Sequence, residues 1–199
     1  MSVPRRPLAV LAALLLAAAA VAGCADVSPL AMTATGTQTL EAAIPADAPA
    51  VTVRVEMFNG PIKVQAGAPG RVSAVVTTRG SGSSNADAEA DRAKIQVTLD
   101  TNPDGSVLLR AVYQPNPSSP NNRAASAVVE VPPGAALDLR TSNGAVTTTG
   151  VAGAVDVRTS NGAVTLADLG AGATVRTSNG AVEIAGSGLL DVETSNGRV

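Results

Sequence analysis

Apolar and polar residues alternate with a period of two along much of this chain, which is the pattern of β-strands with one buried face. Between residues 50 and 134 the alternating runs are short and are separated by turn sequences rich in Gly, Pro, Asn and Ser. We expect strands at 51–57, 62–76, 95–100, 106–113 and 127–131.

Two connections in this part of the chain have a clear local chemistry. The sequence Asn102-Pro103-Asp104-Gly105 lies between two alternating runs and combines residues that favour turns, so it predicts a β-hairpin. Residues 85–94 are rich in Ala and begin with Asn85, which is followed by acidic residues. This pattern predicts one short helix with Asn85 as its N-cap.

The strongest pattern is an internal repeat after residue 134. The tetrapeptide Thr-Ser-Asn-Gly begins at residues 141, 159, 177 and 194, at steps of 18, 18 and 17 residues. A fixed period of this size is typical of stacked architectures whose units complete their core through their neighbours. We therefore predict an all-β fold, a repetitive β-solenoid-like stack of about 18-residue coils on a β-rich platform with one short helix.

Each repeat is expected to turn at its Asn-Gly dipeptide, because Gly and Asn tolerate the left-handed backbone conformation. Asn-Gly also favours two-residue hairpins, so a meander of hairpins is the alternative fold. The strict spacing favours the stack, in which equivalent residues form columns. Two apolar columns are expected: Leu139, Val157, Val175 and Val192, and Val146, Val164, Val182 and Val199.

Two charged columns are expected on the outer surface of the stack. One contains Asp138, Asp156, Thr174 and Asp191, and its neighbour contains Arg140, Arg158, Arg176 and Glu193. Opposite charges two residues apart on one strand face would neutralise each other. In one interpretation, the two columns are therefore an exposed set of ion pairs that contributes little to the free energy of unfolding. The functional alternative is a recognition stripe for sugars or protein, formed by Asp138, Arg140, Asp156, Arg158 and Arg176.

The N-terminus has the features of an export signal. Two arginines precede an apolar run over 8–22, which is shorter than the roughly 20 residues of a membrane-spanning helix. The sequence Val21-Ala22-Gly23-Cys24 that follows resembles the lipobox of bacterial lipoproteins. The resemblance implies a signal peptide over 1–23, cleavage before Cys24 and lipid on the Cys24 thiol; a free or buried thiol is the alternative.

Residues 24–49 show no sustained hydrophobic period and are rich in Ala, Thr and Pro. Such a composition is typical of a linker, so we predict a lipidated Cys24 followed by a flexible tether. An edge strand near 37–42 is the alternative.

Composition narrows the classes of function. The chain has no His or Trp and only one Cys, one Tyr and one Phe, which excludes nucleophile activation by imidazole and an intramolecular disulfide. Without residues 1–23, 12 basic and 16 acidic residues remain, a formal charge of −4. This charge and the scarcity of aromatic rings disfavour a nucleic-acid partner. We expect no catalytic residue, no cofactor and no metal site.

Residues 50–199 resemble a family of bacterial envelope proteins named "putative adhesins", a domain-of-unknown-function group with Ser-Asn-Gly repeats. The resemblance rests on FNGPIKV at 58–64, the short helix before a hairpin, VPPGAALDLRTSNGAV at 131–146 and the RTSNGAV units. It implies a β-solenoid-like fold and a non-enzymatic surface role. Many members carry further repeats and a terminal cap, so we expect that this sequence is either a fragment or is covered at its last coil by a partner.

Together these patterns predict a signal peptide at 1–23, a lipidated tether at 24–49, a platform at 50–134 and repeats at 135–199. We expect a lipoprotein anchored outside the cytoplasm on a cell membrane, with a non-catalytic, adhesin-like binding or structural domain. Its expected partners are the membrane, through the lipid on Cys24, and a cell-wall glycan or an envelope protein. The alternative is an assembly or regulatory protein that pairs through an open edge of the stack, and a hydrolase is less favoured.

Overall fold

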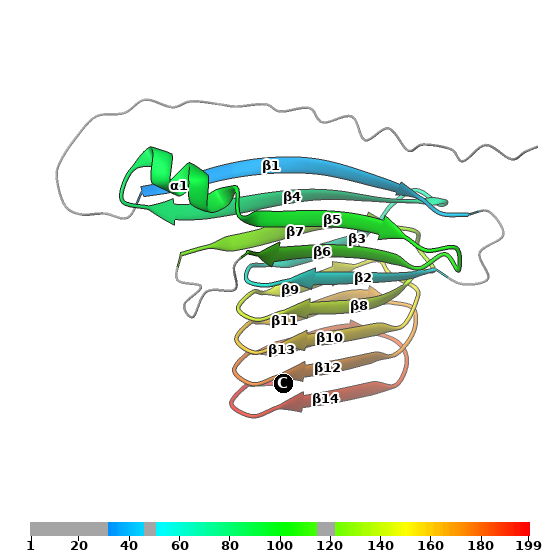
Figure 1. Cartoon of the computed structure of the whole chain (residues 1–199). Helices are drawn as coiled ribbons and strands as arrows, with labels where there is room; N and C mark the ends of the chain where they lie inside the picture. Colours follow the sequence, from blue (N-terminus) through cyan, green and yellow to red (C-terminus); the bar gives the residue numbers. More distant parts are fainter. Residues whose placement is uncertain (1–31, 46–50, 115–121) are drawn as a thin grey trace, which may run out of the picture.

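The fold consists of two seven-stranded β-sheets, seen in a computed structural model that describes residues 32–45, 51–114 and 122–199 (Figure 1). Sheet A contains, in spatial order, β1 (Met32–Ala43), β4 (Arg71–Gly82), β7 (Ala124–Val131), β3 (Ile62–Ala66), β9 (Val146–Thr149), β11 (Val164–Leu169) and β13 (Val182–Gly186). Sheet B contains β14 (Leu190–Thr194), β12 (Ala173–Thr177), β10 (Val155–Thr159), β8 (Ala136–Thr141), β2 (Thr52–Met57), β6 (Val107–Tyr113) and β5 (Ile95–Thr101).

The repeats appear as strands that alternate between the two sheets. Each coil adds one strand to sheet B and the next strand to sheet A, and each strand pairs in parallel with its equivalent in the following coil. The all-β prediction is confirmed. The alternative of a hairpin meander is wrong, because β8 pairs with β10 and β9 with β11, whereas hairpins pair consecutive strands antiparallel.

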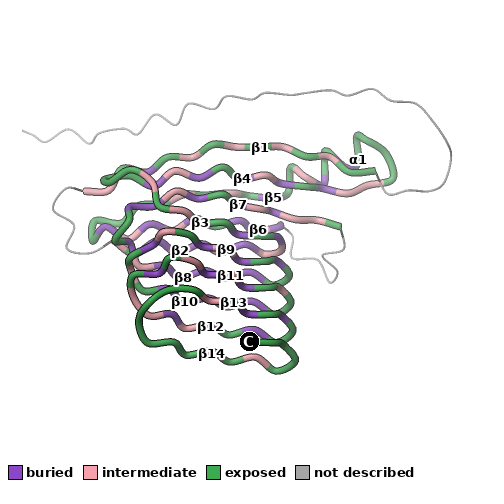
Figure 2. Tube along the Cα trace, turned by 180° about the vertical axis from the view of Figure 1, so that it is seen from behind, coloured by how far each residue is buried: buried purple, intermediate pink, exposed green. Residues whose placement is uncertain are grey.

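The core lies between the sheets and is built mainly from small and β-branched side chains (Figure 2). The register of sheet B confirms the first predicted apolar column. Its members are Leu139, Val157, Val175 and Val192. In the second column Val146, Val164 and Val182 are partners in sheet A. The placement of Val199 in this column is wrong: it is 74% exposed and belongs to no strand, so no pleat turns it inward.

The glycines of the repeated corners are required for close contact between coils rather than for a left-handed backbone. Gly60 in the first corner has a φ of 129°, but the glycines of the four Thr-Ser-Asn-Gly corners have no positive φ. A Cβ on Gly162 would overlap the carbonyl oxygen of Gly144, and one on Gly180 would overlap that of Gly162. The prediction of left-handed corners is therefore wrong at the repeats, since it is the stacking distance that excludes a side chain there.

The predicted platform shares both sheets with the repeats. β2 pairs in parallel with β8 and β3 pairs with β9, so these two strands form a coil next to the first repeat. The predicted hairpin is confirmed, with β5 and β6 paired antiparallel. The predicted run 62–76 is divided into β3 and β4, and β4 is antiparallel to β7.

Residues 32–43 form a strand, so the predicted flexible tether is wrong over this range. β1 pairs antiparallel with β4 along its whole length, from Met32 opposite Gly82 to Ala43 opposite Arg71. Apolar and polar residues alternate only weakly along β1, because only Leu40 and Ala42 bring apolar side chains to the core. The strand exists because β4 offers it a backbone edge of equal length.

The one helix in the described part of the chain, α1 (Asn85–Arg92), lies against β4 and β1 (Figure 1). Its N-cap is Ser84, whose Oγ accepts a hydrogen bond from the backbone N–H of Asp87 at 3.1 Å, and not the predicted Asn85. Gly80 and Gly82 of β4 allow the helix backbone to approach, because a Cβ on either would overlap it. The described residues include no helix that is both long enough and apolar enough to cross a membrane.

Candidate functional site

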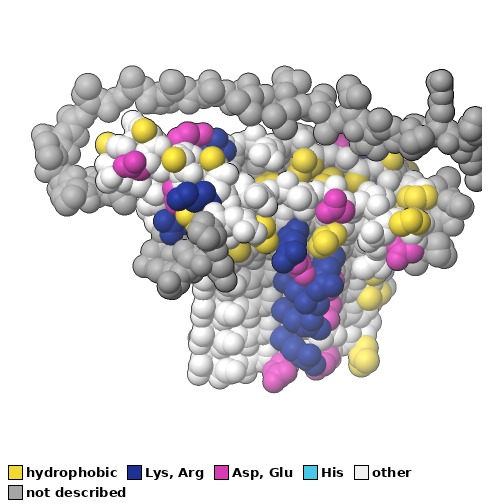
Figure 3. Space-filling view, in the orientation of Figure 1, with side chains coloured by type: hydrophobic (Ala, Val, Ile, Leu, Met, Phe, Trp, Pro, Cys, Tyr) yellow, Lys and Arg dark blue, Asp and Glu magenta, His cyan; other side chains and the backbone are white. Residues whose placement is uncertain are grey.

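The structure places all five residues of the predicted stripe on the outer face of sheet B. Strand pleating turns Leu137 and Leu139 into the core and Asp138 and Arg140 outward. Parallel pairing without offset then stacks each residue on its equivalent. Asp138 is aligned with Asp156, and Arg140, Arg158 and Arg176 are aligned with one another. Figure 3 shows the resulting stripe of basic side chains with acidic side chains beside it.

Three columns cross this face from β6 toward β14. The arginine column comprises Arg110, Glu56, Arg140, Arg158, Arg176 and Glu193. The acid column, two residues earlier on each strand, comprises Arg54, Asp138, Asp156, Thr174 and Asp191. The serine column, two residues later, comprises Ser142, Ser160, Ser178 and Ser195. The platform strands thus extend the arginine column with residues that the repeat pattern did not reveal.

Ion pairs connect the arginine column to the acid column on β8 and β10, but not on β12. Arg140 makes two contacts of 2.9 Å with Asp138, and this hydrogen bonding raises the pKa of Arg140. Arg158 makes one contact of 3.0 Å with Asp156. Arg176 has Thr174 beside it in place of an acid, and its ion pair is with Glu193 at 3.4 Å. Exposed pairs of this kind contribute little to stability, which leaves their guanidinium groups available for other partners.

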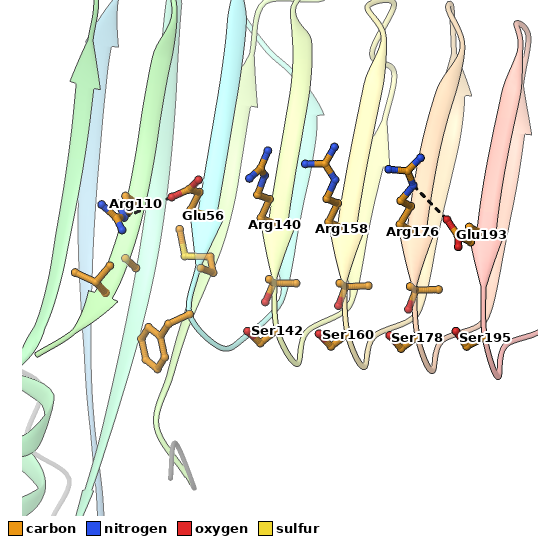
Figure 4. A pocket seen from close by; sticks show the side chains of 17 residues that line it. Glu56, Arg110, Arg140, Ser142, Arg158, Ser160, Arg176, Ser178, Glu193 and Ser195 are labelled. Carbon is orange, nitrogen blue, oxygen red and sulfur yellow. Dashed lines mark ion pairs between the residues drawn. The ribbon is translucent and has the colours of Figure 1, made fainter. Parts of the chain in front are cut away.

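A groove of about 620 Å³ extends along the arginine and serine columns (Figure 4). Its lining includes Arg140, Arg158 and Arg176, with the four serines at the strand ends where the chain turns. Near β2 and β6 the lining becomes apolar and includes Met57, Phe58 and Val112. The groove therefore offers a guanidinium and a hydroxyl group at each of the coils that contain β8, β10 and β12, and one aromatic ring at its platform end.

The serine column is held in place by a ladder of asparagine side chains at the same corners. Asn161 donates a hydrogen bond to Asn143 at 2.7 Å, Asn179 donates to Asn161 at 2.8 Å, and Asn196 donates to Asn179 at 3.0 Å. The backbone repeats this pattern, since the N–H of Asn161 donates to the carbonyl of Ser142. The sequence pattern predicted these asparagines only as turn residues. Their spacing of 18 residues was the signal that could have revealed the ladder.

A second polar cluster surrounds Asp91 of α1, away from the groove. Asp91 is 4% exposed and accepts hydrogen bonds from Tyr113 Oη, from Arg123 Nε at 2.6 Å and from the N–H of Ser81 at 3.0 Å. Burial raises the pKa of Asp91, but the hydrogen bonds from these groups outweigh burial and lower the pKa to about 2. Because this carboxylate is fully engaged, we interpret the cluster as structural. No sequence pattern predicted this cluster, because its members come from distant segments of the chain.

The remaining predicted site residue, Cys24, lies outside the described residues. In the part of the chain that the structure describes, no group of three or more His, Cys, Asp or Glu side chains could hold a metal ion.

Comparison with known proteins finds only distant structural similarity. No protein-family model and no curated protein matches the chain. Solved structures that are similar include a "putative cell adhesion protein" from Clostridium sporogenes, at 10% identity and a TM-score of 0.38, covering 79% of this chain and 99% of that chain. A "putative adhesin" from Bacteroides fragilis is 10% identical with a TM-score of 0.34, covering 79% of this chain and 96% of that chain. Similarity at this level does not identify a function.

Proposed function

We propose that this protein is a lipid-anchored protein of a bacterial cell envelope that binds a glycan, without catalysis, in the groove on sheet B. The observation that carries the proposal is the groove itself, with its regular columns of guanidinium and hydroxyl groups and the ring of Phe58 at one end. Sugars are bound through hydrogen bonds to such polar groups and through contacts of their apolar faces with aromatic rings.

A binding role fits the chemistry of the groove better than catalysis. The chain has no His to activate a nucleophile. The two acidic residues of the groove, Glu56 and Glu193, both take part in ion pairs with arginines. A glycosidase needs two carboxyl groups about 5 to 9.5 Å apart. Glu56 on β2 and Glu193 on β14 are separated by four strand steps of about 4.8 Å in sheet B, which is too far for that role.

Anchoring through Cys24 would hold the domain near the bilayer. β1 begins at Met32, so eight residue steps separate it from Cys24 and span at most about 29 Å. The end of β1 that contains Met32 lies beside α1, at the opposite end of the molecule from β14 (Figure 1). In this orientation the repeats extend away from the membrane and present the groove to the surrounding envelope.

The test is binding of the full chain, purified in detergent, to isolated cell-wall glycans and to a panel of defined glycans. Ser160→Trp places a large side chain on the floor of the groove, and Thr165→Trp makes the same change on the outer face of sheet A. We expect saturable binding that Ser160→Trp abolishes and Thr165→Trp leaves unchanged. Absence of saturable binding to every glycan, or equal binding by the two variants, would disprove the proposal.

A second candidate, the assembly role, involves β14. Among the described residues β14 is an edge strand of sheet B; its first residue, Leu190, is 47% exposed and the preceding Leu189 is 87% exposed. Edge strands of this kind accept a strand from a partner. Cross-linking of the full chain in its native envelope separates the two roles. Loss of a dominant protein cross-link in a Leu189→Asp, Leu190→Asp variant would favour assembly, and no change would leave glycan binding as the better account.

A further inference from the structure

The arginine and acid columns contain equal numbers of basic and acidic side chains, but these are not evenly placed along the groove. Asp138 and Asp156 do not line the groove, although their arginine partners do. The two glutamates that do line it, Glu56 and Glu193, belong to the strands at its two ends. The centre of the groove, over β8, β10 and β12, therefore has three consecutive arginines and no carboxylate among its lining residues.

One substitution in the repeat leaves the most exposed of these arginines without a partner on its own strand. Asp138 and Asp156 each hold the arginine two residues later, but the equivalent position on β12 is Thr174. Arg176 instead contacts Glu193, a side chain that is 75% exposed, at 3.4 Å. A weak, solvent-exposed pair of this kind is readily exchanged for a ligand anion.

From this arrangement we propose that the glycan bound by the groove is acidic, with carboxylate groups that pair with Arg158 and Arg176 while its hydroxyl groups bond to Ser160 and Ser178. This inference rests on the proposed glycan-binding function and adds the chemical class of the ligand. The Arg140–Asp138 pair shows that an arginine of this column binds a carboxylate through two N–H groups, at 2.9 Å each.

The spacing of the columns suits an extended chain that lies along the stack. Neighbouring strands of a sheet are about 4.8 Å apart, so β8, β10 and β12 each present one arginine and one serine at that step. This step is comparable to the length of one sugar unit in an extended glycan. A polymer with a carboxylate on each sugar can therefore place successive carboxylates on successive arginines, which a single small anion cannot do.

The decisive variant restores the acid that the repeat lacks. Thr174→Asp places a carboxylate beside Arg176 on its own strand, where it competes with the ligand without removing any arginine. Thr165→Asp adds the same charge on the outer face of sheet A and is the matched control. Both positions face outward on a strand. Thr174 has acidic register partners on both sides, Asp156 and Asp191, whereas Thr165 has Glu183 on one side and Thr147 on the other, so circular dichroism of both variants checks that each is folded before the titration.

The experiment is calorimetric titration of the full chain, in detergent, with oligogalacturonate, with the same oligomer after methyl esterification, and with poly(glycerol phosphate). We expect oligogalacturonate to bind at least about ten-fold more tightly than its ester, because a charge-assisted hydrogen bond contributes about that factor. Thr174→Asp should lower the affinity by about ten-fold, and Thr165→Asp should leave it within about two-fold.

The outcomes separate this inference from the function on which it rests. Tight binding of the ester, unaffected by Thr174→Asp but abolished by Ser160→Trp, would retain a glycan-binding groove and overturn the acidic ligand. Binding of poly(glycerol phosphate) alone would overturn the carboxylate and assign a phosphate polymer instead. If the wild-type chain binds none of the three probes and no cell-wall glycan, the proposed function fails together with this inference.

Discussion

In the repeats the asparagine side chains make the same contact from coil to coil, whereas at the end that contains α1 the buried polar contacts occur once. Asn143, Asn161, Asn179 and Asn196 form one ladder from four equivalent positions. Asp91, Tyr113 and Arg123 come from three unrelated segments and meet at a single buried carboxylate. The first kind of contact is weak and repeated, and the second is strong and unique.

This difference separates the functions of the two regions. A column of equivalent side chains produces a surface with a regular spacing, which suits a polymeric ligand, and the loss of one member removes only one of several equal contacts. A unique buried cluster cannot be shared among coils, so it fixes one element in one place. The α1 end therefore closes the stack, and the repeats present the groove. Substitutions in each region test this division of roles between the repeats and the α1 end, and the largest effect is expected at a corner glycine.

The repeats should tolerate no side chain at their corner glycines. Gly162→Ala would force a Cβ into the carbonyl oxygen of Gly144, and we expect a loss of about 4 kcal/mol in the free energy of unfolding. Gly134→Ala is the control, because a Cβ there meets nothing within 4 Å. Chemical denaturation followed by circular dichroism measures both. Equal stabilities would show that the coils are not in the close contact described.

The α1 end should depend on one carboxylate. Asp91→Asn removes the buried carboxylate that accepts hydrogen bonds from Tyr113, Arg123 and the N–H of Ser81, so we expect a loss of about 3 kcal/mol in the free energy of unfolding. Asp100→Asn, at an exposed position on β5, removes the same charge and should change stability by less than about 0.5 kcal/mol. Similar losses of stability in the two variants would contradict a stabilising role of the polar cluster around Asp91.

The same carboxylate predicts a dependence of stability on pH. The pKa of Asp91 is about 2 in the folded protein, below its usual value of 3.8. A lowered pKa contributes stability that is fully present above about pH 5 and is lost as the pH falls through about 4 to 2, roughly 2 kcal/mol in all. Denaturation curves from pH 6 to pH 2 should show this loss in the wild-type chain and a smaller loss in Asp91→Asn. Parallel curves of stability against pH for the two proteins would rule out this contribution of Asp91.

The repeats were the part of the fold that sequence predicted best. An 18-residue step places Asp138 above Asp156 and Arg140 above Arg158 in any in-register parallel stack, so the columns followed from spacing alone. The same reasoning failed at the corners, because Asn-Gly has two uses. Its glycine can adopt a positive φ, or it can admit a neighbouring backbone, and the sequence does not distinguish them.

The α1 end was predicted less well because its contacts are not periodic. β1 has few apolar residues, and only its partner β4 makes it a strand. The continuation of the arginine column onto Glu56 and Arg110 was also missed, since both residues precede the first Thr-Ser-Asn-Gly copy and enter the column only through the pairing of β2 with β8 and β6. Long-range pairing of this kind leaves no local signal in the sequence.

The asparagine ladder should lose stability in proportion to the bonds removed. Asn161 takes part in two side-chain hydrogen bonds of the ladder and Asn196 in one. We expect Asn161→Ala to cost about 1 kcal/mol in the free energy of unfolding and Asn196→Ala about half of that. Thermal denaturation of the two variants measures the ratio. A larger effect at Asn196 than at Asn161 would show that the ladder does not contribute as equal repeated bonds.

The most local effect is expected at the N-terminus of α1, and it distinguishes the observed cap from the predicted one. Ser84→Ala removes the acceptor of the Asp87 N–H and should destabilise the helix by about 1 kcal/mol, whereas Asn85→Ala should be close to neutral because Asn85 is already inside the helix. Hydrogen exchange is the suitable measurement, since it resolves local opening of α1 from global unfolding. Faster exchange confined to α1 in Ser84→Ala would show that this helix covers a stack that is stable without it. Faster exchange throughout the repeats as well would show that the two regions unfold as one unit.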